Sequence, residues 1–277
     1  MEPQQSPLYA TYMNELHWQT VIIDGVQIYL KKFPFRQGMV KIHRPLRLPD
    51  PKKLVSIFNT YQIGHVVIEP IHTQNQDTLH TWVSEISKHV KISSAPYLPT
   101  KTILIPLNRP EEVIFSSFSE AKRRAVRRAI SLGVKVSESH NMDDLIRIKN
   151  ASAGLFGFMT TTGMKPLWNI FSKENAASIL LAHDTSHKLI GGVLLLHWDH
   201  VTYYWIAGTI KYGKKLFAPT LLVWESIKLA QKHKSTQFDF VGIWDERIPH
   251  KNLEWKGFTK FKEGFGGESL YYPLVSH

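Results

Sequence analysis

The sequence predicts a mixed α/β fold made of two consecutive halves. Strand-like and helix-like segments alternate along the chain, and their order is similar on both sides of Gly133. A length of 277 residues suits one large domain or two smaller ones. We therefore expect an N-terminal lobe at residues 1–133 and a C-terminal lobe at 134–277, with the segment after about residue 263 packing back on the N-terminal lobe.

In the first half, apolar and polar residues alternate over Val26–Phe33 after the turn Asp24-Gly25, which is typical of a strand. The expected elements that follow are a helix at Pro51–Asn59, a strand at Gly64–Ile71, a helix at Thr81–Val90 and a strand at Thr100–Leu107. The clearest helix runs from Arg109 to Gly133, because proline and two acids suit its first turn and glycine ends it.

The second half repeats this alternation. The expected elements are strands at Val134–Ser139, Ser178–Asp184, Lys188–Trp198, Val201–Gly208 and Phe238–Ile243, and helices at Met142–Ala153, Pro166–Glu174 and Pro219–His233. A hydrophobic content of 43% and a charged content of 21% predict a packed core for both halves.

Cysteine is absent, which excludes disulfides, thiolate nucleophiles and cysteine-ligated metals. Residues 1–16 lack the basic region and apolar run of a signal peptide. The longest apolar stretch, Leu189–Trp198, is far shorter than the roughly 20 residues that span a bilayer. We expect a soluble, cytoplasmic protein.

The formal net charge of +11 favours an anionic partner, because such a field concentrates polyanions. A basic surface that only aids solubility is the alternative. The densest cluster lies within the Arg109–Gly133 helix and comprises Lys122, Arg123, Arg124, Arg127 and Arg128. Like charges four residues apart on a helix repel, so the cluster indicates a phosphate-binding face rather than a merely solvated one.

Several motifs are absent or incomplete. The loop before the Pro219–His233 helix has Ile210 and Lys215 where acyl-CoA-dependent N-acetyltransferases carry their pyrophosphate-binding residues, which argues against acetyl-CoA. There is no Gly-x-Ser-x-Gly, Walker or His-Glu-x-x-His motif. His183 and His187 fall in an expected exposed turn, so we expect no metal and no cofactor.

Two segments are candidates for chemistry. Glu69 precedes Pro70 at a strand end, where it is either a base or substrate contact or a simple edge carboxylate. The stretch Phe258–Gly267, FTKFKEGFGG, is too rich in glycine for a good helix. It is either a basic solvated turn or a place where a lysine works in a partly apolar channel.

Taken together, these residues resemble the FemABX family of tRNA-dependent aminoacyltransferases, which build the interpeptide bridges of peptidoglycan. The resemblance follows the family's order over nearly the whole chain. Its segments are Phe58–Pro70, Thr102–Leu107, Glu111–Val136, Lys165-Pro166, Ala207–Thr209, Ala218-Pro219, Phe238–Ile243 and Phe261-Lys262. The resemblance implies two tandem acetyltransferase-like (GNAT-like) lobes with mixed sheets. No long heptad segment is present, so the compact type without a coiled-coil arm is expected.

The resemblance also implies roles for particular residues. Phe261 and Lys262 would lie in the channel where the aminoacyl end meets the acceptor, and Lys165 would bind the acceptor's phosphates. Glu69 matches a family acid. Relatives often carry Trp-x-x-x-Lys near the N-terminus, whereas Ile22 follows Trp18 at that spacing here, so Lys31 or Lys32 would have to supply the phosphate contact.

The function implied is transfer of an amino acid from aminoacyl-tRNA to an amine of a peptidoglycan precursor, either UDP-linked or lipid-linked, with peripheral membrane contact compatible. The basic helix, together with Lys214 and Lys215, would bind the tRNA. A protonated Lys262 would stabilise the negative charge of the transition state. The alternatives are an N-acyltransferase that uses an acyl-CoA donor on another amine, and a non-catalytic RNA-binding protein.

Overall fold

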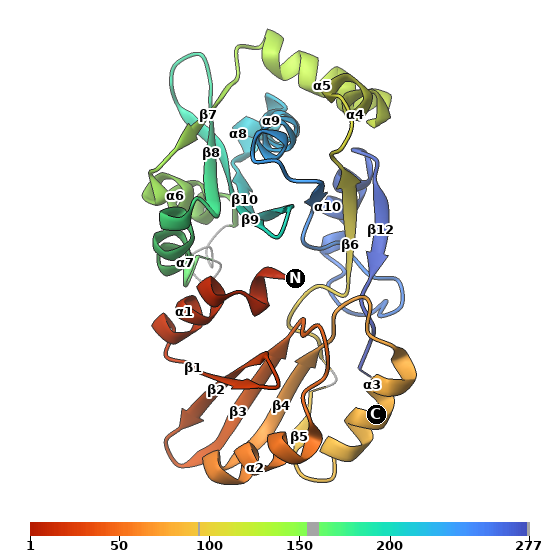
Figure 1. Ribbon diagram of the computed structural model, residues 1–277. Coiled ribbons are helices and arrows are strands. Elements are labelled where there is room, and N and C mark those ends of the chain that lie inside the picture. The colour runs from red at the N-terminus through yellow and green to blue at the C-terminus, as the bar shows by residue number, and fades with distance from the viewer. Residues whose placement is uncertain (94, 154–160, 276–277) are drawn as a thin grey trace. The chain divides into compact units, whose positions relative to one another are not determined.

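The computed structural model describes residues 1–93, 95–153 and 161–275. The chain divides into two compact units (Figure 1): unit 1 holds Met1–Lys101 and Leu270–His277, and unit 2 holds Thr102–Ser269. The division after Lys101 differs from the expected boundary at Gly133. The reason is that the segment 102–131 supplies a strand of the second sheet and a helix that packs on another helix of that unit.

Unit 1 contains a five-stranded sheet in the order β1-β2-β3-β4-β5. Strands β1 to β3 are antiparallel neighbours, whereas β3, β4 and β5 run parallel to one another. The strands are β1 (Gln19–Ile23), β2 (Val26–Phe33), β3 (Arg36–His43), β4 (Ile63–Glu69) and β5 (Lys91–Ile92), and the helices are η1 (Pro3–Gln5), α1 (Pro7–Glu15), α2 (Pro51–Tyr61) and α3 (Gln76–Ile86).

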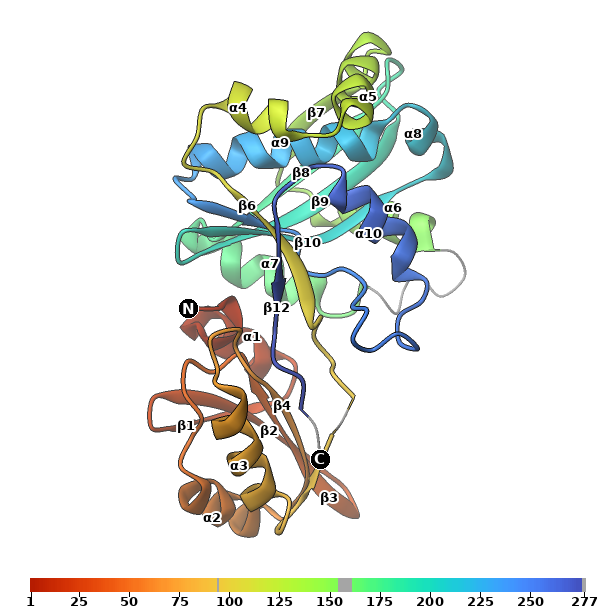
Figure 2. The same ribbon diagram turned by 90° about the vertical axis from the view of Figure 1, so that its right-hand side faces the viewer.

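The helices of unit 1 form where the sequence offers caps. Asp50 accepts a hydrogen bond of 2.9 Å from the Lys53 amide at the start of α2. Asn75 caps α3 in the same way, which explains why this helix begins five residues before the expected Thr81. Figure 2 shows α2 and α3 beside each other on the sheet, where Leu54, Leu79 and the strand residues form one core.

Unit 2 contains a seven-stranded sheet in the order β12-β6-β11-β10-β9-β8-β7. Its strands are β6 (Lys101–Pro106), β7 (Lys135–Ser139), β8 (Ala177–His183), β9 (Leu189–Trp198), β10 (Val201–Thr209), β11 (Gln237–Asp239) and β12 (Glu268–Tyr271). Its helices are α4 (Glu111–Ser117), α5 (Glu120–Ser131), α6 (Met142–Ala153), α7 (Met164–Phe171), η3 (Ser172–Glu174), α8 (Lys211–Lys215), α9 (Ala218–Lys232) and α10 (Trp255–Glu263). In Figure 2, α4, α5 and α9 cover one face and α6 and α7 the other.

Two strands of this sheet separate near its centre. Strands β10 and β11 run parallel and are paired only from Val201 and Gln237 to Tyr203 and Asp239. Beyond that point β10 continues to Thr209, with a register shift against β9, whereas β11 has ended. The expected strand Phe238–Ile243 is therefore shorter than predicted: β11 ends at Asp239, although the Phe240 amide still donates a hydrogen bond of 3.1 Å to the Ile103 carbonyl oxygen of β6.

Two local predictions were wrong. The expected Arg109–Gly133 helix is two helices, because the backbone is extended at Phe118, which is buried in the core, and Ser119 then caps α5. The stretch Phe258–Gly267 is helical as far as Glu263, because its glycines begin only at Gly264. Among the helices of the described residues, none combines the length and apolar character needed to cross a bilayer.

Candidate active site

Lys262 lies near the end of α10, next to the point where β11 leaves the sheet. Its ammonium donates hydrogen bonds to the carbonyl oxygens of Phe240, at 2.8 Å, and Gly242, at 2.6 Å. The Phe258 ring centroid lies 4.9 Å from Nζ, so one side of the charge faces an aromatic ring. The cation is thus fixed in a polar and partly apolar environment.

The two carbonyls converge because the backbone turns sharply at Val241, whose φ is 68°. A β-branched residue in this region is strained, and such strain is found most often at functional sites. The turn is held by Asp239, whose Oδ1 accepts hydrogen bonds from the Val241 amide at 2.6 Å and from Thr102 Oγ1 at 2.5 Å. Sequence reasoning assigned no role to Asp239, and only the FDFVGI motif pointed to this segment.

Burial lowers the pKa of Lys262 to about 8, and the charge of Asp239 opposes this shift. The group therefore remains largely protonated at neutral pH. An ammonium has three N–H donors. The contacts within the described residues engage two of them, through Phe240 and Gly242, which leaves one donor for a bound molecule.

Phe261 is partly buried and forms the link between α10 and α5. Its ring centroid lies 5.2 Å from that of Phe265 and 3.7 Å from Nζ of Lys122. Burial lowers the pKa of Lys122 to about 8. The Lys122 stem lies so close to Gly264 that a Cβ there would be 2.6 Å from Lys122 Cε. Lys122 therefore packs on α10 instead of extending into solvent.

The remaining basic residues of α5 differ in their surroundings. Arg123 donates hydrogen bonds to the carbonyl oxygens of Ser116, at 2.6 Å, and Phe118, at 2.7 Å, and so caps the end of α4. Arg124 makes a long, exposed ion pair of 3.5 Å with Glu120. The exposed members of the predicted tRNA-binding set are Arg124, Arg127, Arg128, Lys214 and Lys215.

Lys165 lies on α7 and forms an ion pair of 2.6 Å with Asp143 of α6. Both side chains are more than half exposed, so solvent screens this pair and it is weak. Lys165 can therefore exchange Asp143 for another anion at little cost.

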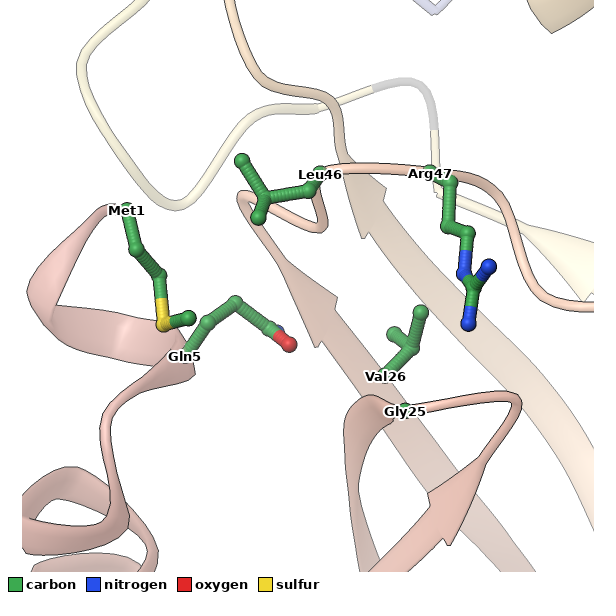
Figure 3. Close-up of a pocket in the computed structure, with 6 residues that line it drawn as sticks. All are labelled: Met1, Gln5, Gly25, Val26, Leu46 and Arg47. Atoms are coloured by element: carbon green, nitrogen blue, oxygen red, sulfur yellow. The ribbon is translucent and has the colours of Figure 1, made fainter.

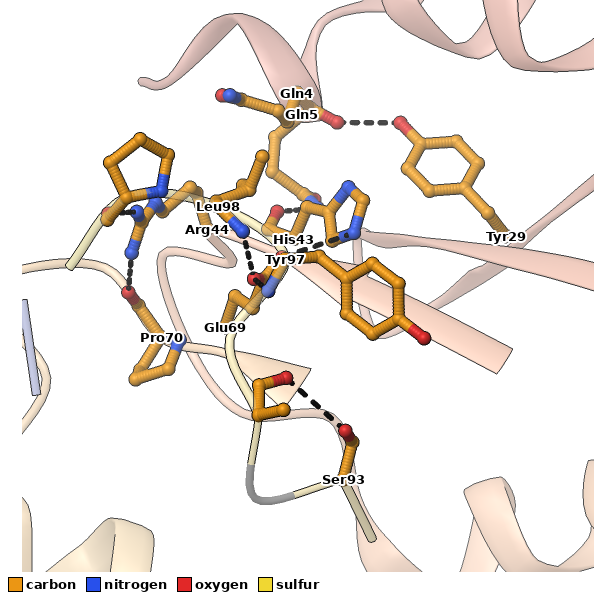
Figure 4. Close-up of polar contacts among 12 residues, drawn as sticks. Gln4, Gln5, Tyr29, His43, Arg44, Glu69, Pro70, Ser93, Tyr97 and Leu98 are labelled. Carbon is orange, nitrogen blue, oxygen red and sulfur yellow. Dashed lines mark hydrogen bonds and ion pairs between the residues drawn. The ribbon is translucent and has the colours of Figure 1, made fainter. Parts of the chain in front are cut away.

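In unit 1, Glu69 ends β4 in a buried polar cluster (Figure 4). Oε1 accepts hydrogen bonds from the backbone amides of Tyr97, at 2.6 Å, and Leu98. Oε2 lies 3.1 Å from Nε2 of His43. Burial raises the pKa of Glu69, whereas the amides and Arg44 lower it, and the net direction is upward.

His43 has the opposite character. Burial, together with the charges of Lys41 and Arg44, lowers its pKa to about 3, so its imidazole is neutral at physiological pH. With only 4% of either residue exposed, His43 and Glu69 form an interior pair. This geometry favours a positioning role for Glu69 over direct contact with a substrate.

Arg44, which sequence reasoning missed, is also buried in this cluster. Its guanidinium donates to the carbonyl oxygens of Pro70, at 2.8 Å, and Pro99, at 2.5 Å, and stacks 3.4 Å above the Tyr272 ring. It joins three chain segments that are far apart in sequence. The only local signal was a basic residue directly after a strand.

The Trp18 ring lies close to lysines from two strands, β2 and β3. Nζ of Lys31 lies 5.4 Å and Nζ of Lys41 4.5 Å from its ring centroid, whereas Lys32 lies over Tyr61 at 4.8 Å. Of the two predicted lysines, Lys31 is therefore the one beside Trp18. Lys41 is a second cation there that the sequence did not single out.

A hollow of about 340 Å³ lies elsewhere in unit 1 (Figure 3). It is lined by Met1, Gln5, Gly25, Val26, Leu46 and Arg47. The Arg47 guanidinium donates to the carbonyl oxygen of Asp24, and none of the predicted site residues lines the hollow.

Two other predictions concern turns. The His183–His187 segment is a turn between β8 and β9, where the buried Asp184 accepts hydrogen bonds from the amides of Ser186 and Lys188, both at 2.9 Å. In the loop compared with acyl-CoA sites, Gly213 is buried, and a Cβ there would lie 2.4 Å from the Ile190 carbonyl oxygen. That glycine therefore allows close packing of α8 on β9.

Comparison with known proteins finds similarity to a family model and to several solved structures. Residues 170–272 match the model described as the FemAB family. The crystal structure of FemX shares the fold, with a TM-score of 0.76 and 14% sequence identity over 98% of this chain and 90% of that chain. These matches show similarity to the FemAB family over residues 170–272 and a fold shared with FemX. No curated protein matches its sequence.

More distant structures share the same architecture. A putative lysylphosphatidylglycerol synthetase C-terminal domain from Agrobacterium fabrum matches with a TM-score of 0.61 and 10% identity, over 97% of this chain and 86% of that one. A tandem GNAT protein from the clavulanic acid biosynthesis pathway matches with a TM-score of 0.54 and 7% identity, over 89% and 77%. The predicted fold of two GNAT-like lobes with mixed sheets is confirmed.

Proposed function

We propose that this protein transfers an amino acid from aminoacyl-tRNA to an amine of a peptidoglycan precursor. The match of residues 170–272 to the FemAB family model and the fold shared with FemX support an aminoacyltransferase of interpeptide bridge formation. The observation that carries the proposal further is the ammonium of Lys262, which Phe240 and Gly242 hold where β10 and β11 separate.

The chemistry needs no activation beyond the ester of the charged tRNA. The amine nitrogen attacks the ester carbonyl carbon and forms a tetrahedral oxyanion. The bond to the ribose oxygen then breaks, an amide forms, and the proton lost by the amine ends on the released ribose hydroxyl. A fixed donor aimed at the developing negative charge lowers this barrier more than a solvated one, because it needs no reorganisation.

The side chains of Lys262 and Phe261 have separate tasks in this scheme. Lys262 donates its remaining N–H to the oxyanion or to the leaving ribose oxygen. Phe261 packs between α10 and Lys122, so it fixes the helix that carries the lysine and keeps water from its inner side.

The exposed cations bind the two anionic substrates. Arg124, Arg127, Arg128, Lys214 and Lys215 contact the tRNA backbone, since phosphate contacts from arginine and lysine dominate such affinity. Lys31 and Lys165 contact the phosphates of the precursor. Lys32, which follows Lys31 in the sequence, and Lys41, which lies with Lys31 beside Trp18, contribute to these contacts. Glu69 holds the end of β4 in place within unit 1.

The direct test incubates the protein with a mixture of charged tRNAs and candidate precursors, both UDP-linked and lipid-linked, and measures the added mass by mass spectrometry. The proposal predicts a precursor heavier by one amino-acid residue, and only when charged tRNA is present. Transfer of an acyl group from acyl-CoA instead, or RNA binding with no transfer to any precursor, would contradict it.

A further inference from the structure

The hairpin between β2 and β3 in unit 1 ends in the sequence Lys32–Gln37, KFPFRQ, and all six residues are exposed. Phe33 and Arg36 are the last paired residues, so Pro34 and Phe35 form the two-residue loop. Phe33 is 39% exposed, and the side chain of Phe35 is fully exposed. Two phenylalanines therefore stand at the tip of a hairpin with no described side chain covering Phe35.

The backbone at this tip is strained in a way that hairpin loops normally avoid. Phe35 has a φ of 58°, a region that loops usually fill with glycine, asparagine or aspartate. A bulky aromatic residue is unfavourable there, and its exposure to water adds a second cost. Strain that persists in an exposed position indicates a role outside the folding of the chain.

The charge around the tip has one sign. Between Gly25 and Pro49 the sequence contains six basic residues and no acid. They are Lys31, Lys32, Arg36, Lys41, Arg44 and Arg47. Lys31, Lys32 and Arg36 lie next to the tip, and Nζ of Lys32 is 4.8 Å from the Tyr61 ring centroid. Lys41, Arg44 and Arg47 lie towards or beyond the other end of β3, and Arg44 is buried there, so the charge at the tip comes from the first three.

An apolar tip with a basic collar matches an anionic lipid surface. Aromatic side chains bury themselves at the boundary between headgroups and acyl chains, while lysine and arginine stay at the headgroup level and attract anionic lipids. A single RNA strand fits less well. Proteins that bind single strands use a positively charged groove in which bases stack on aromatic side chains, whereas a two-residue loop is convex and offers no groove.

We propose that the Phe33–Phe35 tip inserts into anionic membrane surfaces and anchors unit 1 peripherally. The proposal does not rest on the reaction that the protein catalyses. If the acceptor is lipid-linked, such an anchor brings the Trp18 lysine pair, Lys31 and Lys41, to the surface that displays its phosphates.

The experiment is co-sedimentation of the full chain with vesicles of phosphatidylcholine mixed with phosphatidylglycerol, compared with vesicles of phosphatidylcholine alone. The wild-type protein should bind the mixed vesicles much more tightly. Phe35→Ser should weaken this binding about tenfold to a hundredfold. Arg36→Gln should weaken it about fivefold and reduce its dependence on salt.

Ile22→Ser is the matched control, because Ile22 is 68% exposed in the same unit but lies at the other end of the β1–β2 pair, opposite Gln27. It should bind vesicles as the wild type does. Phe35→Trp gives a second readout, since its fluorescence should shift to the blue when anionic vesicles are added. Equal binding of the wild type and Phe35→Ser, or a loss of tRNA affinity in Phe35→Ser with vesicle binding unchanged, would overturn the proposal.

Discussion

Glu69 in unit 1 and Lys262 in unit 2 are both ionisable groups at the end of a strand or helix, and burial shifts the pKa of each toward its neutral form. Their surroundings differ. Glu69 is 4% exposed, with two amides and His43 around its oxygens. Lys262 is only partly buried, and its recorded partners engage two of its three donors.

This difference supports the proposal that Glu69 is a structural group and Lys262 a working one. Protein amides hold the Glu69 carboxylate inside unit 1, whereas a partly exposed cation with a spare donor can serve a reaction. The comparison predicts that changes at groups like Glu69 alter stability and that changes near Lys262 alter turnover.

The largest effect is expected for Glu69→Ala, because it removes the acceptor for the Tyr97 and Leu98 amides and leaves a cavity beside His43. Loss of one member of a buried charged cluster typically costs about 3 to 5 kcal/mol. Chemical unfolding followed by circular dichroism measures it. Glu69→Gln keeps an oxygen that can accept hydrogen bonds from these backbone amides, so it should lower the free energy of unfolding by less. A Glu69→Gln protein of normal stability but without activity would contradict the positioning role.

A buried ionisable group in unit 2 tests whether burial among protein partners, rather than the unit in which a group lies, makes that group important for stability. His197 in unit 2 contacts Thr202 Oγ1 at 2.8 Å and Ser178 Oγ at 3.0 Å, and its ring stacks on His233. Burial and the charge of His233 lower its pKa to about 3.

In the unfolded chain a histidine has a pKa of about 6.5, so only the unfolded state gains this proton between pH 6.5 and 3. The free energy of unfolding should therefore fall as the pH drops through this window, by about 2 to 4 kcal/mol for His197. His197→Gln should show a shallower fall in acid unfolding curves. A mutant as acid-sensitive as the wild type would show that other groups dominate.

The sequence predicted elements that depend on local patterns better than features that depend on contacts between residues far apart in the chain. Alternating and buried apolar runs predicted most strands correctly, because the core of each sheet imposes its period on the local sequence. In unit 1 the sequence did not predict α1 or the strands β1, β3 and β5, and it displaced α3. Phe118 breaks the predicted long helix because tertiary burial of its ring outweighs helical propensity.

The candidate site was only partly predictable for the same reason. The motif order pointed to Phe261 and Lys262, but helical spacing alone could not show that Lys122 and Arg123 turn into protein contacts while Arg127 and Arg128 remain exposed. Likewise, the positive φ of Val241 could not be predicted, because β-branched residues rarely adopt this conformation.

A smaller effect is expected for Lys122, which packs on Phe261, the neighbour of Lys262. Because its ammonium lies 3.7 Å from the Phe261 ring, Lys122→Met should lower kcat about tenfold and leave KM for tRNA unchanged, since it positions α10. Lys122→Arg, which keeps a cation over the ring, should restore part of the rate. A rise in KM alone would show that Lys122 is a tRNA ligand.

The smallest effects are expected at the exposed arginines. Arg127→Gln and Arg128→Gln should each raise KM for tRNA a few-fold and reduce the slope of log affinity against log salt by about 1, because under the proposed function each removes one phosphate contact. Filter binding at several salt concentrations measures this slope. Unchanged slopes in both variants would place the tRNA surface elsewhere.

In the proposed function the Lys262 ammonium stabilises the transition state. Single-turnover transfer from charged tRNA should be about 100-fold to 1000-fold slower in Lys262→Met, because removing one such donor typically has this effect. Lys260→Met, which removes an exposed cation two residues away on the same helix, is the matched control and should react at the wild-type rate. Equal rates for Lys262→Met and Lys260→Met, with both proteins folded, would contradict the claim.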